Sequence, residues 1–281
     1  MTAGDIKISA AGTIKDAMPG AVCNGNDDYI EGAGLDALGV AECANNTAKG
    51  TIAGWINVPD ISGSYCLFSL GDNDAAEYLH FGVEAGKLFG ACDDAATMQW
   101  DINSTNTVIT PHHWHHIAIT QDGVRPKMYV DGQAVAMTDT TTTDLTEWLA
   151  GLDGIDKGAI GILQMNGTTT LDFKGAIAYV RYARTCWTPD EIKAEYDYRC
   201  GFGTGSGTTG YCLWKLQADA VEYTTGAGTY DGTIVSDVQY DPQYSSLTSA
   251  LRTLAPVVAD ATNIIPAGVD GSCAMVAVKA A

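Results

Sequence analysis

Four potential metal ligands lie close together near the middle of the chain: His112, His113, His115 and His116. Neutral imidazole is a common ligand of transition metals. These histidines surround Trp114 and lead into Ile117, in a stretch with the composition of a β-strand. Neighbouring side chains of a strand point to opposite faces, so the histidines are divided between two faces. Trp114 and Ile117 also call for burial, and the pattern therefore favours structural histidines over a metal site.

Two short acidic stretches, Asp72-Asn73-Asp74 and Cys92-Asp93-Asp94, could supply oxygen ligands to Ca²⁺. Neither continues as an EF-hand loop, which requires Gly at its sixth position and Glu at its twelfth. Short acidic loops are usually solvated turns. The sequence therefore predicts no bound cofactor or metal, with Ca²⁺ as the one candidate ion.

The stretch Gly205 to Gly210, GSGTTG, matches the G-x-G-x-x-G pattern of dinucleotide-binding loops. Such a loop follows a strand and opens a helix, so that the helix N-terminus meets the phosphate. Here a predicted helix precedes the stretch and a predicted strand follows it. The stretch is therefore interpreted as a linker.

Composition narrows the function classes. The chain has 281 residues, only 17% of them charged, and a net charge of −19. This balance argues against nucleic-acid binding through a basic surface. No run of 18 or more apolar residues occurs, which predicts no membrane span. The N-terminus lacks a basic region followed by an apolar one, which predicts a protein made in a cytoplasm without a secretory signal.

The eight cysteines have wide and irregular spacing, and no C-x-x-C pair occurs: Cys23, Cys43, Cys66, Cys92, Cys186, Cys200, Cys212 and Cys273. This spacing supports neither a zinc ribbon nor a thioredoxin-type motif. We expect mostly free thiols, and Cys186–Cys200 or Cys200–Cys212 are the pairs that could form a disulfide.

The elements that would position these residues are mostly strands. Asp122-Gly123 and Asp131-Gly132 are hairpin turn signals, and they divide residues 112–137 into a three-stranded meander. We expect this meander in the centre of a sheet, with Trp114 and Ala118 on one face and Ile117 and Ile119 on the other. Further strands are predicted at residues 51–58, 65–70, 77–83, 87–92, 97–102, 159–164 and 171–184.

Helical signals are few. Residues 35–38 suggest a short turn, residues 139–144 a Thr-rich loop, and residues 145–152 one or two helical turns with Trp148 and Leu152 inward. Thr188-Pro189-Asp190-Glu191 has the pattern of a capping box and predicts a helix with Ile192 and Tyr196 on its inner face.

Four segments are expected along the chain: an N-terminal arm at 1–20, a β-sandwich at 21–200, a Gly-rich linker at 201–210, and a C-terminal extension or small assembly domain at 211–281. The last segment remains apolar almost to the C-terminus, so we expect it to pack against something.

Residues 21–198 resemble a laminin-G-like domain of the concanavalin A-like lectin/glucanase superfamily. The resemblance is strongest in WHHIAIT, followed by a turn and KMYVDG, and in the closing stretch GAIAYVRYARTCWTPDEI. It implies an all-β fold of two antiparallel sheets in a jelly-roll sandwich. Many relatives carry Asp-Glu where this chain has Ala178-Tyr179. Because that strand is implied to lie beside Asp27 and Asp28, a calcium site built from both strands would lose one side.

The superfamily includes glycoside hydrolases, which need two carboxylates about the scissile bond. The sandwich-type enzymes present them as E-x-D-x-x-E on one strand, and this chain has no such run. Glu195-Tyr196-Asp197 comes nearest and belongs to a predicted helix. The sequence therefore predicts no catalytic residues and no enzyme.

Two functional hypotheses remain. The first is a structural protein on a phage virion surface, such as a capsid decoration or tail protein, made in the host cytoplasm and contacting copies of itself or other virion proteins. The second is an extracellular carbohydrate-binding, lectin-like module. Tyr65, Tyr78 and Trp100 could stack on sugar rings, although packing in the core or at a sheet edge is the simpler interpretation.

Overall fold

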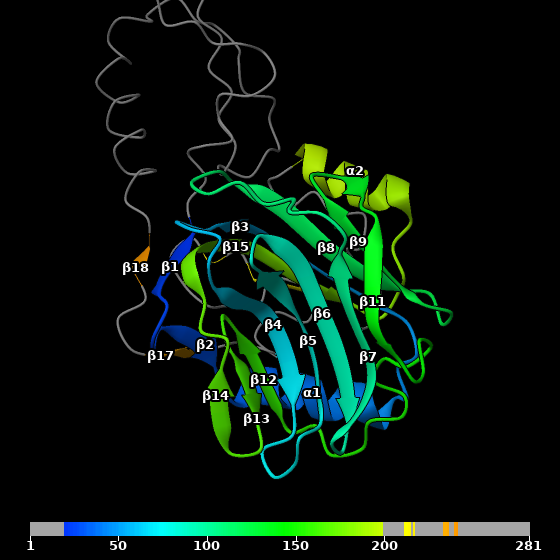
Figure 1. The fold of residues 1–281 in the computed structure, drawn as a ribbon. Helices are drawn as coiled ribbons and strands as arrows, with labels where there is room; N and C mark the ends of the chain where they lie inside the picture. Colours follow the sequence, from blue (N-terminus) through cyan, green and yellow to red (C-terminus); the bar gives the residue numbers. More distant parts are fainter. Residues whose placement is uncertain (1–19, 199–210, 215, 217–232, 236–238, 241–281) are drawn as a thin grey trace, which may run out of the picture.

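The fold is known from a computed structural model, which describes residues 20–198, 211–214, 216, 233–235 and 239–240. Two antiparallel β-sheets stack face to face (Figure 1), as the sequence predicted. Sheet A has the order β10-β9-β8-β3-β15-β1-β18, with β16 also paired to β15, and sheet B has the order β11-β7-β6-β5-β4-β12-β2-β17. β13 and β14 form a separate hairpin.

The strands of sheet A are β1 (Ala21–Asn24), β3 (Gly50–Asn57), β8 (His115–Gln121), β9 (Pro126–Val130), β10 (Gln133–Ala134), β15 (Lys174–Ala183), β16 (Tyr211–Trp214) and β18 (Gln239–Tyr240). The strands of sheet B are β2 (Tyr29–Glu31), β4 (Ser64–Gly71), β5 (Tyr78–Glu84), β6 (Lys87–Asp94), β7 (Thr97–Ser104), β11 (Met137–Thr142), β12 (Lys157–Ile160) and β17 (Thr233–Val235). The remaining elements are β13 (Leu163–Met165), β14 (Thr168–Thr170), α1 (Ala33–Ala44) and α2 (Pro189–Tyr198).

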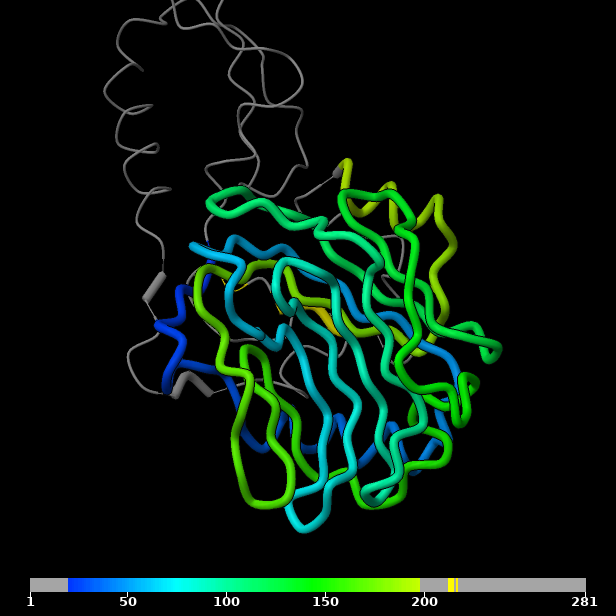
Figure 2. Tube along the Cα trace, viewed as in Figure 1, coloured from blue at the N-terminus to red at the C-terminus, as the bar shows by residue number. Residues whose placement is uncertain are grey.

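The main core lies between the two sheets. Phe81 and Trp100 enter it from sheet B, and Ile117 and Tyr182 enter it from sheet A, all with their side chains buried. β1, near the start of the described chain, pairs with β15 near its end, so segments far apart in sequence close one sheet (Figure 2). Burial of this many aromatic and aliphatic side chains is the main force that holds the sandwich together.

The meander of residues 112–137 has the predicted facing but a different place in the sheet. Ile117 and Ile119 of β8 lie in the main core, whereas Trp114 and Ala118 lie in a second cluster on the other side of sheet A. The prediction of a central position was wrong, because β9 and β10 form one edge of sheet A and only β8 pairs inward, with β3. The alternation of side chains fixes which face is buried but does not determine which strand becomes the edge.

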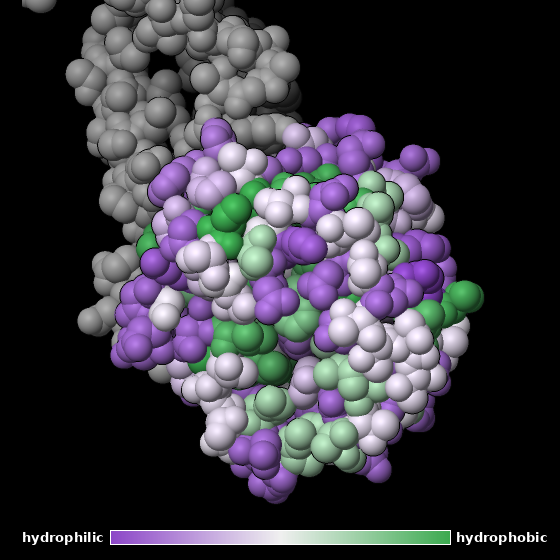
Figure 3. All heavy atoms as spheres, viewed as in Figure 1, coloured by the Kyte–Doolittle hydropathy of each residue, from purple (hydrophilic) through white to green (hydrophobic). Residues whose placement is uncertain are grey.

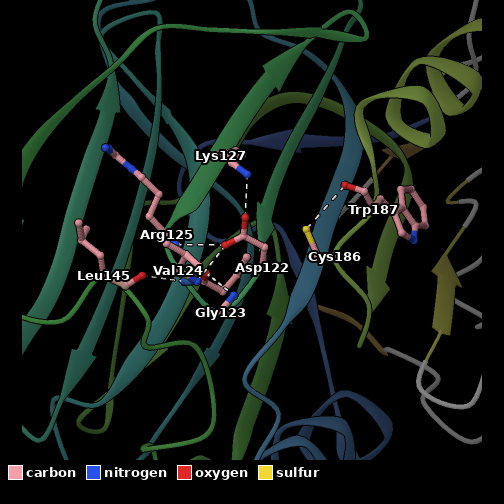
Figure 4. Close-up of polar contacts among 9 residues, drawn as sticks. Asp122, Gly123, Val124, Arg125, Lys127, Leu145, Cys186 and Trp187 are labelled. Carbon is pink, nitrogen blue, oxygen red and sulfur yellow. Dashed lines mark hydrogen bonds and ion pairs between the residues drawn. The ribbon is translucent and has the colours of Figure 1, made fainter.

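The first turn of the meander, between β8 and β9, is held by Asp122. Its Oδ1 accepts the backbone N–H of Val124 at 2.9 Å, and its Oδ2 accepts from Lys127 Nζ at 2.7 Å (Figure 4). Figure 4 also shows the carbonyl of Leu145 at this turn, where it accepts from the amide of Gln121 at 2.9 Å. The Asp-Gly signal in the sequence thus marks a turn that side-chain hydrogen bonds stabilise.

Residues 33–44 form a helix, α1, where the sequence suggested only a short turn at 35–38. Leu35, Leu38 and Glu42 are buried at helical spacing, and the helix packs on β12. The buried Glu42 carboxylate breaks the apolar pattern, and it accepts hydrogen bonds from Tyr182 Oη at 2.8 Å and Arg184 Nε at 2.7 Å. Because this core position is acidic, the apolar periodicity that would predict a helix is interrupted in the sequence.

Two predictions for residues 139–152 were also wrong in part. Residues 137–142 form strand β11 at the edge of sheet B, paired with β7, rather than a loop. Its alternate residues are exposed, so its Thr-rich composition reflects strand propensity at a solvated edge. Residues 145–152 form turns and bends without a helix, although Trp148 and Leu152 are buried as expected.

β16 lies in the segment predicted to be a C-terminal extension. It pairs with Val180 to Ala183 of β15, and Trp214 and Leu216 are buried in the main core. The first part of this segment therefore belongs to the sandwich. The predicted arm at 1–20, apart from Gly20, and the linker at 201–210 lie outside the described residues, as does the apolar C-terminal end.

Helix α2 covers the outer face of sheet A. Its capping box forms as predicted: the backbone N–H of Glu191 donates to Thr188 Oγ1 at 3.3 Å, and that of Thr188 donates to Glu191 Oε2 at 2.7 Å. Ile192 is buried, and the ring of Tyr196 stacks on Trp55 with centroids 5.6 Å apart. α2 thus seals this face over the second apolar cluster.

Candidate functional site

The outer face of sheet B presents a different surface. Because Leu79, Phe81 and Val83 of β5 point into the core, the alternate residues Tyr78, His80 and Glu84 point outward. The same reasoning assigns Phe89 of β6, together with Asp101 and Asn103 of β7, to this face. Figure 3 shows the side of the molecule on which sheet B lies as a mixture of hydrophilic and near-neutral residues with small apolar patches.

Three aromatic rings lie side by side on this face. The rings of His80 and Phe89 meet edge to face, with centroids 4.7 Å apart, and Tyr78 lies 5.6 Å from His80. Tyr78 and Phe89 are partly exposed, whereas His80 is buried. Burial raises the pKa of Tyr78 to about 12, with the charges of Asp93 and Asp101 adding to the effect, so this ring keeps its phenol proton. The rings form a platform with polar groups at its sides.

Polar side chains flank the platform at fixed register. Asn103 lies directly opposite Phe89, and Ala91 lies between His80 and Asp101 in the next row of the sheet. The Asn103 amide lies 3.5 Å from Asp101 Oδ1. Burial raises the pKa of the Asp101 carboxyl, and the negative charge of Glu84 raises it further. A carboxylate and an amide side by side offer acceptors and donors to a polar ligand.

A shallow groove of about 460 Å³ runs along one side of this face. It is lined by residues from β4, β5, β6, β7 and β11 and from the adjoining turns: Ser62, Ser64, Glu84, Ala85, Lys87, Asn103, Thr138 and Thr140. Ser64 Oγ donates to Glu84 Oε1 at 3.1 Å. Apart from Ala85, each lining residue carries a hydroxyl, amide or charged group, and such groups can hydrogen-bond to a ligand rich in hydroxyl groups.

Three polar atoms of the face are buried without a hydrogen-bond partner: His80 Nδ1, Asp93 Oδ1 and Asn103 Oδ1. Buried polar atoms usually have partners, because an unmade hydrogen bond is unfavourable. Of these residues, Asn103 also lines the groove. These three atoms therefore lie beneath the surface of the face, beside its aromatic platform.

The four histidines singled out in the sequence do not come together as one site. His112 and His113 are exposed before β8, and His115 and His116 point to opposite faces of that strand. His115 Nδ1 donates to Asp131 Oδ2 at 2.9 Å, because its Nε2 accepts the backbone N–H of Thr110 at 3.0 Å. His116 is buried beside the stacked rings of Trp55 and Tyr196. His115 and His116 thus have the structural roles that the alternation favoured.

Of the acidic stretches, Asp72-Asn73-Asp74 is tied into a loop, whereas Cys92-Asp93-Asp94 ends strand β6. Asp72 Oδ1 accepts the backbone N–H of Asp74 at 2.7 Å, and Asp28 Oδ2 accepts that of Asn24 at 3.0 Å. β15 does pair with β1, but Ala178 lies opposite Trp55 of β3, away from the Asp27-Asp28 bend, which lies near Lys174. Within the parts of the chain that the structure describes, no three His, Cys, Asp or Glu side chains gather closely enough to hold a metal ion.

The remaining candidate residues are distributed as follows. Tyr65 and Trp100 lie in the main core, so of the three suggested aromatic residues only Tyr78 belongs to the outer face. Glu195 is buried in an ion pair with Arg181 beneath α2, and Asp197 pairs with Lys193 on the exposed side of that helix. Cys23, Cys66 and Cys92 are buried free thiols, as expected, whereas Cys200 and Cys273 lie outside the described residues.

Sequence reasoning missed the residues of the outer face, apart from Tyr78. His80, Phe89 and Asp101 were predicted only as parts of strands, and Asn103 lay just beyond the strand predicted at 97–102. Their signal was the alternation within residues 77–83 and 87–92, because the positions that alternate with the aliphatic residues must face away from the core.

No helix among the described residues is long and apolar enough to cross a membrane.

Comparison with known proteins places the chain among lectin-like folds. A family profile described as the concanavalin A-like lectin/glucanases superfamily matches residues 24–193. A candidate carbohydrate-binding protein from Bacteroides ovatus has a TM-score of 0.51 and 18% identity, over 80% of this chain and 59% of that one. A comparison with curated proteins found no match.

Two further structures come from sialidases. The NanB sialidase of Streptococcus pneumoniae has a TM-score of 0.50 and 17% identity, over 63% of this chain and 28% of that one. The CBM40 module of a Ruminococcus gnavus IT-sialidase, bound to α2,3-sialyllactose, has a TM-score of 0.49 and 17% identity, over 63% of this chain and 97% of that one. At these identities the likeness concerns the fold alone.

Proposed function

The chain belongs to the concanavalin A-like lectin/glucanase superfamily, and on that premise we propose that it is a non-catalytic carbohydrate-binding module. Its ligand would lie on the outer face of sheet B. Fold alone does not determine function, so the proposal rests on the residues of that face.

One observation carries the proposal: the two outer faces of the sandwich differ in kind. Sheet A is covered by α2 over an apolar cluster. Sheet B instead presents the partly exposed rings of Tyr78 and Phe89, which pack against the buried His80, beside Asp101 and Asn103. The C–H groups of a sugar ring can pack on an aromatic ring, while its hydroxyl groups exchange hydrogen bonds with carboxylate and amide groups. The platform, its polar sides and the groove together offer both kinds of contact.

The virion hypothesis has no comparable support, because the similar structures named above are a carbohydrate-binding protein and sialidases. Assembly with copies of itself and a virion surface location therefore stay predictions from the sequence. The absence of an enzymatic role is likewise part of the proposal, and it agrees with the structural roles of Glu195 and Asp197 in α2.

A glycan array followed by calorimetry tests the proposal. Phe89→Ala and Asn103→Ala should each weaken binding to any glycan that the protein retains, by roughly tenfold or more, since each removes a direct contact. Asn26→Ala, in the exposed loop between β1 and β2, is the matched control for Asn103→Ala and should bind normally. Retention of wild-type affinity in both outer-face variants would place the ligand elsewhere, and the absence of any glycan binding would refute the proposal.

A further inference from the structure

The charges of the outer face narrow the class of ligand. We infer that this face selects uncharged sugars and rejects sugars that carry carboxylate or sulfate groups, with Glu84 and Asp101 as the residues that determine this selectivity. The inference rests on the proposed carbohydrate-binding function and deepens it. It is carried by the charge arrangement on sheet B and by the positions of the arginines in the fold.

Three carboxylates belong to the outer face, on three adjacent strands: Glu84 of β5, Asp93 of β6 and Asp101 of β7. Lys87 is the one lysine that lines the groove, and it lies directly opposite Glu84 in the register of β5 and β6. Its positive charge is therefore offset locally, and the face as a whole stays negative. A ligand carboxylate or sulfate placed on the platform would meet like charges.

The described arginines are engaged elsewhere. Arg125 pairs with Asp139, Arg181 with Glu195, and Arg184 with Glu42. Arginine is the usual partner for a ligand carboxylate, because its planar guanidinium group binds two oxygens at once. Among the residues that the structure describes, none of this type is placed on the face where the platform lies.

The carboxylates that would repel an anion can accept hydrogen bonds from neutral hydroxyl groups. A sugar hydroxyl group can donate to Asp101 or Glu84, and hydrogen bonds to a charged acceptor are stronger than those between neutral groups. Asn103, which lines the groove, adds an amide group to these carboxylates. These groups offer mainly acceptors, and a vicinal diol supplies the matching donors.

The test uses the full-length chain and matched pairs of glycans. Lactose is compared with 3′-sialyllactose, and an array supplies further neutral glycans with their uronate and sulfated counterparts. We expect the neutral member of each bound pair to bind at least about tenfold more tightly, because each added charge meets several carboxylates. Raising the NaCl concentration should reduce this preference, since salt screens repulsion between exposed charges.

A charge variant gives a second and sharper readout. Glu84→Gln/Asp101→Asn should lose affinity for the neutral sugar and gain relative affinity for its acidic counterpart, so that the preference falls by roughly tenfold. Asp190→Asn/Asp197→Asn removes two charges from α2 on the other sheet and controls for net charge. This control should leave the preference unchanged.

The outcomes separate the two proposals. Equal or tighter binding of the acidic glycans, abolished by Lys87→Ala, would overturn the charge selectivity and leave the carbohydrate-binding function standing. A preference that moves equally in the control variant would also overturn the role of Glu84 and Asp101. If neither the wild-type chain nor the charge variant binds any glycan, both proposals fail together.

Discussion

At the scale of single residues, two buried histidines couple stability to pH. Burial lowers the pKa of His80 and that of His116 to about 3, and for His116 the nearby charge of Arg181 lowers it further. In the unfolded chain both pKa values return to about 6.5. Below pH 6.5 the unfolded state therefore binds protons that the folded state does not, and the free energy of unfolding falls as the pH falls toward 3.

We expect each histidine to reduce the free energy of unfolding by about 2 kcal/mol between pH 7 and pH 5. Urea unfolding at the two pH values measures this. His80→Phe and His116→Gln should each remove about half of the histidine contribution, and comparison with the wild-type protein cancels the titration of carboxylates. An unchanged pH dependence in both variants would show that these rings do not remain neutral in the folded protein.

The ion pair between Arg181 and Glu195 is the second feature at this scale. Both side chains are almost fully buried beneath α2, at 1% and 5% exposure. Removing one partner leaves a buried charge without its neutralising neighbour, which is strongly unfavourable.

Glu195→Gln should therefore reduce the free energy of unfolding by about 3 kcal/mol, as measured by urea unfolding. Asp197→Asn is the matched control, because it breaks the exposed pair with Lys193 in the same helix. Exposed pairs contribute at most about 1 kcal/mol. Equal effects of the two substitutions would mean that the buried pair does not hold α2 on the sheet.

At the scale of elements, α2 was the most predictable part of the structure. Its start is encoded locally, since Thr188 and Glu191 satisfy each other's backbone N–H groups within one turn. α1 and β11 were not predictable in the same way. The first has a buried Glu42 stabilised by Tyr182 and Arg184, more than 130 residues away in sequence, and the second needs β7 to accept its backbone hydrogen bonds.

Thr188→Ala should reduce the free energy of unfolding by about 1 kcal/mol, because the helix loses a side-chain cap. Thr188→Ser keeps the hydroxyl group and serves as the control, with little expected change. Chemical unfolding of both variants measures the difference. A loss of the same size in both would assign the effect to the methyl group of Thr188 rather than to the cap.

At the scale of the whole molecule, the sandwich extends past the helix that closes the recognised family segment. The profile match ends at residue 193, yet β16 pairs with β15, and Trp214 and Leu216 lie in the main core. A chain that ends at residue 198 would therefore lose part of its own core.

We expect the chain ending at 198 to unfold at a lower temperature than the full chain or to be insoluble. Loss of the fully buried Trp214 alone should reduce the free energy of unfolding by about 3–5 kcal/mol. A chain ending at residue 216 keeps β16 and is the control, and it should retain more stability in a thermal unfolding experiment. Equal stability of the chain ending at 198 and the full chain would show that β16 is dispensable.

Alternation and capping in the sequence predicted most strands, the facing of the meander and the start of α2, because both act between residues close together in the chain. The fold class was implied by the resemblance to laminin-G-like domains. The composition also argued against a protein that binds nucleic acid through a basic surface, and against a protein that spans a membrane. Most of the candidate site could not be predicted from the sequence, because its residues look like ordinary strand residues: His80, Phe89, Asp101 and Asn103.

Which outer face of the sandwich is open to solvent could be learned only from the packing of the folded chain. α2 covers sheet A because Tyr196 and Ile192 pack onto Trp55 and its neighbours, and the outer side of sheet B keeps its aromatic and polar residues at the surface. This packing also placed the meander at an edge and added β16 to the core. These outcomes depend on contacts between distant segments, and local patterns carry no information about which distant surfaces will meet.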